Sequence, residues 1–442
     1  MFLLLPLFIS AAFSLTLLAP LAGLVFLSAI LPAFLIRFQL YGIPTSILEL
    51  ATYSVALAIV ARIALDAELR RAVKEKMIFV WRERCGVVIS VGLFFAAALI
   101  ATLFSVDFER SLGVLKGWYL DPLIFGVLFF LVSRGGGDII KVIAGFSVGA
   151  AVLSGLGIVE YFSTFDAYST IGTRADSIFE SPNYLAMLLA PIIAMVIAVL
   201  AFVRDVWRQV IILSLLLASL ALNLVAFYLT FSYGGFVGLT LAVIWLFGAF
   251  AFGKMRNRKT IILIGAALAV ILLLVAASSF GSAKFQRDFF DREGLSSFRG
   301  RAELWQTAVF IIKKQPLAGL GLGNYDKGYL RYAHEAIGGE PLEPLMIHAH
   351  NIFLDFWTDS GIIGLLAFLL LAGYFFKLYW SVRLYSPGLA NGAAAAMIAT
   401  LGHGLLDTPY FKNDLSYIFW FIIFIPITLA YLKHESRTKF TE

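Results

Sequence analysis

The sequence is short of cysteine and of charge, and both shortages narrow the possible classes of protein. Cys85 is the only cysteine among 442 residues, so neither an intramolecular disulfide nor a cysteine-rich metal site can form. Only 14% of the residues are charged, against about 25% in a typical soluble domain. Because 61% of the residues are hydrophobic, a water-soluble enzyme is excluded and a polytopic membrane protein remains.

Apolar runs long enough to cross a bilayer as helices recur from one end of the chain to the other. We predict an all-α polytopic membrane protein with about 12 transmembrane helices, 12 or 13 in all, and a large helical outer loop. The stretch 2–36 supplies one or two of them, because it is too long for one straight span and Pro20 offers a break. The other expected spans are 45–65, 84–105, 113–133, 138–160, 183–203, 209–230, 235–253, 259–280, 358–380, 388–406 and 415–432.

The basic residues of the short loops predict an orientation. If 66–84 is cytoplasmic, strict alternation places nineteen Lys and Arg in short inner loops and five in short outer loops. The net charge of +6 is therefore read as a topology signal, and no nucleic-acid partner is expected. We expect a cytoplasmic C-terminus, with the long loops 161–182 and 281–357 on the outer face.

The chain divides into three expected regions. Residues 1–280 hold the N-terminal transmembrane helices, 281–357 form the large outer loop with the catalytic residues, and 358–442 hold the C-terminal transmembrane helices and a cytoplasmic tail. Within the loop, the apolar residues of 301–314 recur at helical spacing, and a second short helix is expected over 323–336. The first helix would lie over the membrane and help to cover a cleft. Glycines between the two helices predict a plain turn with close packing.

The outer loop ends in two histidines that are candidates for chemistry. His348 and His350 are two residues apart, so neither a helix nor a strand would bring both to one metal ion, and no metal site is expected. One of them could act as a neutral imidazole that accepts a proton near pH 7. A helix-capping histidine, hydrogen-bonded to backbone, is the structural alternative for this segment. Asn351 follows directly, before the next span.

Cationic residues of the outer segments are candidates for binding phosphate, because arginine offers two parallel hydrogen bonds and a permanent charge. Arg301 and Arg299 lie in the large loop and Arg174 in the smaller one. Lys116 lies inside an apolar span, where an ionisable residue is a functional candidate. A solvated surface role for the arginines, and a helix pair between Lys116 and Asp121 or simple snorkelling, are the structural alternatives.

Several motifs together resemble the O-antigen ligase and O-antigen polymerase family of bacterial membrane glycosyltransferases. His350-Asn351 followed by Gly361 and Gly364 is similar to the family's outer-loop signature. The segment from Arg301 through the glycine turn to Tyr325 resembles the stretch upstream of that histidine. Two more segments resemble family motifs, namely Arg174 with Pro182-Asn183-Tyr-Leu-Ala and the turn Asp407-Thr-Pro-Tyr-Phe-Lys-Asn-Asp414.

The resemblance implies a metal-independent, inverting transfer of a glycan from undecaprenyl diphosphate to an acceptor hydroxyl at the outer face of the bacterial inner membrane. The acceptor would be a lipid A core sugar in a ligase, a lipid-linked glycan in a polymerase, or a protein in related members. Carried over to this sequence, the resemblance makes His350 the base and gives Arg301 and, less directly, Arg174 to the diphosphate. Lys116 and Arg299 are further donor-binding candidates, and His348 and Asn351 have supporting roles; no cofactor is expected.

One departure from the family pattern bears on the donor site. Many members carry Ser-Arg-Gly after the central spans, whereas this chain has Ser232-Tyr233-Gly234. Tyr233 cannot bind a diphosphate as a cation, so it is assigned a supporting role. A transporter or flippase for lipid-linked glycans is the alternative from another class. The concentration of polar residues in one outer loop, without a convincing internal repeat, favours the enzyme.

Overall fold

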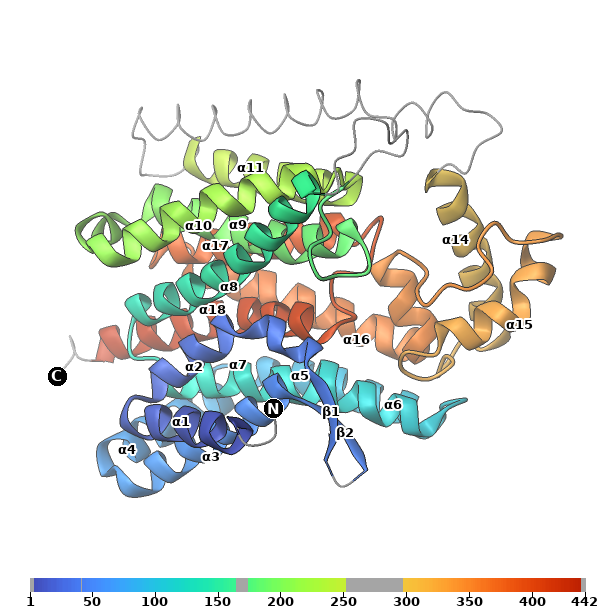
Figure 1. Cartoon of the computed structure of the whole chain (residues 1–442). Coiled ribbons are helices and arrows are strands. Elements are labelled where there is room, and N and C mark those ends of the chain that lie inside the picture. The colour runs from blue at the N-terminus through green and yellow to red at the C-terminus, as the bar shows by residue number, and fades with distance from the viewer. Residues whose placement is uncertain (1–3, 41, 164–173, 252–296, 439–442) are drawn as a thin grey trace.

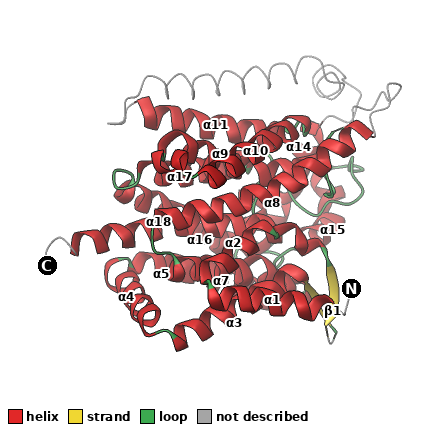
Figure 2. Cartoon of the chain, turned by 60° about the vertical axis from the view of Figure 1, so that its left-hand side comes forward, coloured by secondary structure: helices red, strands yellow, loops and turns green. Residues whose placement is uncertain are grey.

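The computed structural model describes residues 4–40, 42–163, 174–251 and 297–438, and this part of the chain is helical apart from one small hairpin (Figures 1 and 2). Eight of its helices are long and apolar enough to cross a membrane. The helices of the bundle are α1 (Leu4–Leu18), α2 (Pro20–Ala29), α3 (Ile47–Leu65), α5 (Cys85–Leu103), α7 (Asp121–Val132), α8 (Gly136–Ser163), α9 (Pro182–Phe202), α10 (Val210–Leu229), α11 (Tyr233–Ala251), α16 (Ile352–Val382), α17 (Pro387–His403) and α18 (Asn413–Thr438). The remaining elements are the short helix η1 (Leu31–Leu35), the strands β1 (Arg37–Leu40) and β2 (Ile43–Ser46), α4 (Ala67–Glu83), α6 (Phe108–Val114), the π-helical segment η2 (Leu115–Leu120), η3 (Arg204–Arg208), α14 (Ser297–Lys314) and α15 (Tyr325–Ile337).

The observed helices agree closely with the spans expected in the described residues. The expected span 84–105 is α5, for example, and the first apolar stretch is divided because α2 begins at Pro20. The expected span 259–280 and the loop residues up to 296 lie outside the described residues. The chain is thus an all-α polytopic membrane protein, and the count of about 12 spans stays a prediction.

The elements outside the bundle gather at its two ends. Figure 1 shows α6, α14, α15 and the β1–β2 hairpin at one end, and α4 with the C-terminus at the other. The hairpin, in which Phe38 pairs with Thr45, was not expected from the sequence. The basic helix α4 therefore lies opposite the elements of the large loop, as the expected orientation requires.

Small residues and enclosed polar groups hold the bundle together. Helix α18 is buried by its neighbours from Asp414 to Leu432, and the alanine- and glycine-rich α17 packs against α9 and α11. A side chain at Gly238 would collide with the backbone of α17, so glycine allows the two helices to approach closely. Between α8 and α10, Ser154 donates a hydrogen bond to Asn223 at 2.9 Å, which satisfies both groups away from water.

The glycine turn between α14 and α15 docks into a break in α16. Gly361 has φ +65° and ψ −172°, a conformation that only glycine adopts readily, and it interrupts the helix. The backbone N–H of Leu320 donates to the Thr358 carbonyl at 2.8 Å, and Ile362 N–H donates to the Pro316 carbonyl at 2.9 Å. The turn expected from the glycines is therefore present, and it ties the loop to the start of a membrane helix.

The two helices expected in the outer loop are also present. The predicted 301–314 lies within α14, and the predicted 323–336 overlaps α15. Leu304 and Ile311 of α14 pack with Tyr325 and Tyr329 of α15 in a small core of their own. Because this core holds α14 in place, it also positions Arg301 in the first part of that helix.

Candidate functional site

The segment that carries His350 is fixed at the junction of loop and membrane helix. Asn351 is the N-cap of α16, and its Oδ1 accepts hydrogen bonds from the backbone of Phe353 and Leu354 at 3.0 and 3.1 Å. Its side-chain amide donates to the Leu405 carbonyl at 3.0 Å. Asn351 thus caps the helix and joins it to the turn between α17 and α18.

His350 pairs with an acidic residue of that turn. Its Nδ1 lies 2.9 Å from Oδ1 of Asp407, whose side chain is 3% exposed. Because a carboxylate only accepts hydrogen bonds, Nδ1 carries the proton and Nε2 is left with a free lone pair. The His350 backbone has φ +50°, which is uncommon for a residue with a side chain and is tolerated best by Asn, Asp and His. The imidazole is therefore oriented by a buried carboxylate and by a strained backbone, as is frequent at functional sites.

Asp407 is held in its charged form. Burial alone would raise the pKa of Asp407, but the charge and hydrogen bond of His350, together with His403 and Arg301, keep it below the usual range. Its Oδ1 also accepts the backbone N–H of Thr408 at 3.1 Å. An ionised carboxylate at this position stabilises an imidazolium if His350 gains a proton.

Arg301 reaches the same turn from the first part of α14. Its Nε donates to the Leu406 carbonyl at 2.8 Å, its Nη1 donates to the Ser297 carbonyl at 3.2 Å, and its Nη2 lies 4.0 Å from Oδ2 of Asp407. The side chain is only 13% exposed. These contacts fix the guanidinium in one position and bring it close to the pair of His350 and Asp407.

A cavity of about 330 Å³ lies against these residues. Both Arg301 and His350 line it, as does Asn183 at the start of α9. Glu303 also lines it but is engaged elsewhere, because its carboxylate accepts the Leu342 backbone N–H at 2.9 Å. The cavity therefore offers a permanent cation and an imidazole to one small polar ligand group.

His348 is buried beside the site and does not line the cavity. Burial lowers the pKa of His348 to about 3, and the charges of His350 and Lys412 act in the same direction. Its ring packs near Trp118, with 6.3 Å between ring centroids. Asp355 of α16 accepts the Ala349 backbone N–H at 2.9 Å and so anchors the segment between the two histidines. His348 is thus a buried, packed residue, and its supporting role stays a prediction.

Arg174 does not line the cavity but contacts a residue that does. Its Nη2 donates to Oδ1 of Asn183 at 3.0 Å, and its Nε donates to the Thr230 carbonyl at 2.7 Å. Since Asn183 lines the cavity, Arg174 lies one residue behind the cavity wall. Its role in binding the donor stays a prediction.

The other candidates lie apart from the cavity. The side chain of Arg299 is 61% exposed and lies 3.7 Å from Glu303, while the Tyr233 ring stacks on Phe298 with an interplanar angle of 12°. Lys116 lines a different cavity and pairs with Glu49 at 2.7 Å, not with Asp121. The structure brings His350 and Arg301 together, and it adds none of these three residues to their cavity.

Asp407 is the residue of this candidate site that sequence reasoning did not assign. It enters the family resemblance only as the first residue of a late turn, and it lies 57 positions from its partner His350. The signal available was an acidic residue directly after an apolar span. Among the described residues, no three His, Cys, Asp or Glu side chains are grouped so that they could hold a metal ion.

The arrangement is suited to removing a proton from a hydroxyl group next to a negatively charged leaving group. A neutral Nε2 can accept the proton, Asp407 stabilises the resulting charge, and Arg301 can bind phosphate oxygens. None of these groups needs to become covalently attached to the substrate.

Comparison with known proteins agrees with the family that the motifs resemble. Residues 218–369, about a third of the chain, match the family model described as O-antigen ligase, and this range includes Arg301 and His350 but not Asp407. An O-antigen ligase from Pseudomonas aeruginosa is 30% identical over 201 residues, which cover 44% of this chain and 41% of the relative. An uncharacterized protein from Haemophilus influenzae is 23% identical over 150 residues, or 31% of this chain and 36% of the relative. The chain thus matches less than half the length of either relative.

Proposed function

We propose, from the match of residues 218–369 to the O-antigen ligase family, that this chain is a membrane glycosyltransferase that moves a glycan from undecaprenyl diphosphate to an acceptor hydroxyl. The observation that supports it most directly is the hydrogen bond of His350 to buried Asp407 beside the cavity that Arg301 also lines. The proposed acceptor is a lipid A core sugar or an equivalent surface acceptor. The reaction is placed at the outer face of the bacterial plasma membrane.

In the proposed mechanism His350 is the general base. Its Nε2 takes the proton of the acceptor hydroxyl as that oxygen attacks the anomeric carbon of the donor sugar. The bond from this carbon to the diphosphate oxygen breaks on the opposite face, so the configuration is inverted. Asp407 stabilises the imidazolium, and the proton is later released to solvent or to the departing diphosphate. General base catalysis of this kind typically contributes about 10²–10⁴-fold to the rate.

Arg301 stabilises the leaving group in this mechanism. Negative charge grows on the diphosphate as the bond breaks, and a fixed cation is worth most where that charge develops. The backbone contacts of Arg301 hold its guanidinium in place before substrate arrives. The reaction needs no metal ion in this scheme, because arginine supplies the positive charge.

The test is transfer by the purified full chain in liposomes. A defined undecaprenyl diphosphate-linked glycan is offered with lipid A core, a second lipid-linked glycan or a serine-containing peptide as acceptor. We expect transfer to at least one acceptor, loss of transfer in His350→Ala, and no effect of a chelator. Movement of the donor across the bilayer without any transfer would instead favour a flippase. Full activity of a folded His350→Ala variant would remove His350 as the base.

The proposed orientation is tested separately by cysteine labelling. In a Cys85→Ala background, a cysteine at exposed Leu345 should react with a membrane-impermeant maleimide added to intact cells. A cysteine at Lys74 in α4 is the matched control, and we expect it to react only after the membrane is permeabilised. The reverse pattern would contradict the proposed topology.

A further inference from the structure

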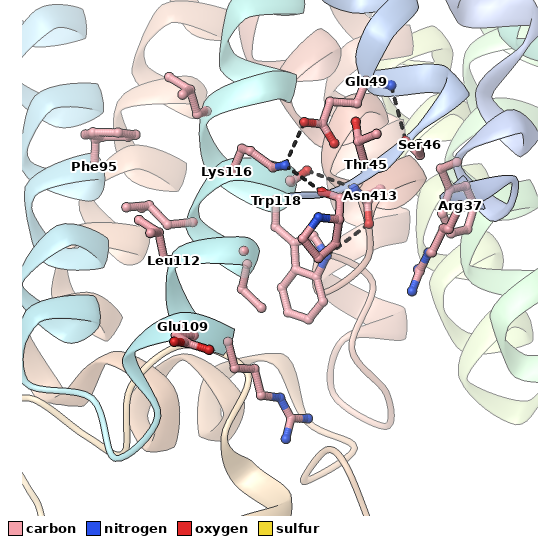
Figure 3. Close-up of a pocket in the computed structure, with 18 residues that line it drawn as sticks. Arg37, Thr45, Ser46, Glu49, Phe95, Glu109, Leu112, Lys116, Trp118 and Asn413 are labelled. Atoms are coloured by element: carbon pink, nitrogen blue, oxygen red, sulfur yellow. Dashed lines mark hydrogen bonds and ion pairs between the residues drawn. The ribbon is translucent and has the colours of Figure 1, made fainter. Parts of the chain in front are cut away.

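A second cavity, larger than the one at His350, lies where the β1–β2 hairpin meets α6 and the π-helical segment η2. Its volume is about 670 Å³. Figure 3 shows that Lys116, Trp118, Asn413 and Arg37 gather around it, with Glu49 above Lys116. In the proposed orientation, this cavity lies toward the outer end of the membrane helices, beside the start of α3 and against Phe95 of α5.

The polar part of the cavity carries more positive than negative groups. The Lys116 ammonium lies 2.7 Å from Glu49 and 3.0 Å from the Pro44 carbonyl, so it is held in place and remains 26% exposed. Arg37 is exposed, and its guanidinium lies 6.0 Å from the Phe34 ring; no acidic side chain in the described part of the chain forms an ion pair with it. Lys116 and Arg37 both line the cavity, so an anionic headgroup inside it has two cations to contact, one of them without a carboxylate partner among the described residues.

The remaining charges of the cavity do not cancel this preference. Arg110 and Glu109 also line it, and Arg110 pairs with Asp326 at 2.7 Å. Figure 3 shows Glu109 below Leu112, apart from Lys116 and Arg37. The end of the cavity near the hairpin therefore keeps a positive character.

Most of the cavity wall is apolar. Phe34, Phe95, Leu112 and Leu120 line it, and Leu112 and Leu120 are 49% and 38% exposed. In a membrane, exposed side chains of this kind face hydrocarbon chains. A ligand that fits both parts of the cavity has an apolar chain along these residues and an anionic head near Lys116.

The helix is distorted at the point where it forms this cavity. Residues Leu115–Leu120 are π-helical, and such single-turn distortions are often found at functional sites. The Trp118 carbonyl accepts a hydrogen bond from the Tyr410 hydroxyl at 2.8 Å, and Trp118 Nε1 donates to Asn413 at 3.3 Å. These bonds stabilise the distortion and fix the indole ring in the cavity wall. The same ring packs near His348, so the cavity borders the segment that carries His350.

We infer that this cavity binds a lipid with a phosphate-bearing headgroup, at a site separate from Arg301. Lys116 and Arg37 bind the phosphate oxygens, and the apolar wall of Phe95, Leu112 and Leu120 holds the first part of the lipid chain. Binding at this site does not depend on the proposed transferase activity. Two lipids carry this chemistry, namely an isoprenoid phosphate and an anionic phospholipid.

The experiment measures binding of farnesyl phosphate to the purified full chain in neutral detergent by calorimetry. Farnesol and inorganic phosphate are the matched probes that lack the head or the chain. We expect farnesyl phosphate to bind about tenfold or more tightly than either, the scale of one charge-assisted hydrogen bond. Equal binding of farnesol would overturn the phosphate site.

Variants locate the binding. Lys116→Gln and Arg37→Gln should each weaken binding of farnesyl phosphate about tenfold. Leu112→Trp, which fills the cavity from the apolar side, should do the same without removing a charge. Lys313→Gln in the last turn of α14 is the control for a lost surface charge, and it should bind farnesyl phosphate as the native protein does. Binding unchanged in the first three variants, or weakened as much in Lys313→Gln, would refute the proposal.

A competition arm separates the two lipid sources. The measurement is repeated in nanodiscs of phosphatidylcholine with increasing phosphatidylglycerol. Loss of farnesyl phosphate binding as phosphatidylglycerol increases identifies the ligand as an anionic phospholipid. Binding that persists identifies an isoprenoid phosphate. Because this readout is binding, a failure here is distinguishable from a failure of glycan transfer, which His350→Ala tests.

Discussion

Replacing Asp407 by asparagine removes one charge beside His350 while keeping the shape of the side chain. In the native protein the imidazole Nδ1–H donates to a buried carboxylate at 2.9 Å. A hydrogen bond to a charged group contributes about 1.5–3 kcal/mol, roughly twice or more a neutral one. If that stabilisation acts on the imidazolium formed in the transition state, its loss corresponds to about one to two factors of ten in kcat.

The assay is the rate of glycan transfer in liposomes under saturating donor and acceptor, measured across the pH range. We expect Asp407→Asn to lower kcat more than it changes KM. The acidic limb of the profile should move to lower pH, because an imidazolium without its carboxylate partner is less stable. Asp138→Asn, which removes a carboxylate paired with Lys141 at 3.1 Å, is the control. A folded Asp407→Asn protein with native kcat and an unchanged pH profile would refute the role assigned to Asp407.

The same variant has a second readout, because the pKa of Asp407 determines how stability changes with pH. Since this pKa is lower in the folded protein than the ordinary 3.8, the carboxylate contributes stability above that pH and loses the contribution as the pH falls. The difference in melting temperature between the native protein and Asp407→Asn should therefore be largest near neutral pH and shrink below about pH 4. A difference that stays constant down to the acid range would contradict this assignment.

Three further predictions follow from single contacts. Arg301→Lys should lower the transfer rate at least about tenfold with little change in melting temperature, because a point charge cannot replace a planar guanidinium that donates in several directions; native activity would argue for a structural role. Gly361→Ala should destabilise the protein by about 1–3 kcal/mol or more, since its backbone conformation suits only glycine and a Cβ would collide with the Leu317 carbonyl; this is measured by thermal melting, and an unchanged melting temperature would contradict it. Lys76→Met should cost about 1–3 kcal/mol, because the buried ammonium donates to three carbonyls at the end of α7, at 2.5–3.0 Å; a melting curve equal to that of the exposed control Lys74→Met would disprove it.

The parts of the structure that could be predicted from sequence are those set by local pattern. Hydropathy located α5 and α9 to within a few residues, and helical periodicity located α14, whose buried face includes Leu304 and Ile311 as expected. The proximity of His350 and Arg301 was suggested by family motifs, since both belong to one loop. Each of these features depends on neighbours along the chain.

The features that were missed depend on contacts between distant segments. The pairing of His350 with Asp407 joins the start of α16 to the turn after α17, and no periodicity encodes such a meeting. A helix pair with Asp121 was one alternative for Lys116, but η2 turns Lys116 toward Glu49 of α3. The break at Gly361 was likewise not predicted, because helical structure and apolar residues continue on both sides of it.

The docking of the glycine turn into broken α16 has a consequence for protein engineering. Residues 316–323 and 358–362 exchange backbone hydrogen bonds, so each segment satisfies N–H or carbonyl groups of the other. A chimera that takes an outer loop without this glycine turn but keeps this chain's α16 would leave the carbonyl groups of Thr358 and Asp359 without these partners. The smallest exchangeable unit therefore runs from the start of α14 through Ile362.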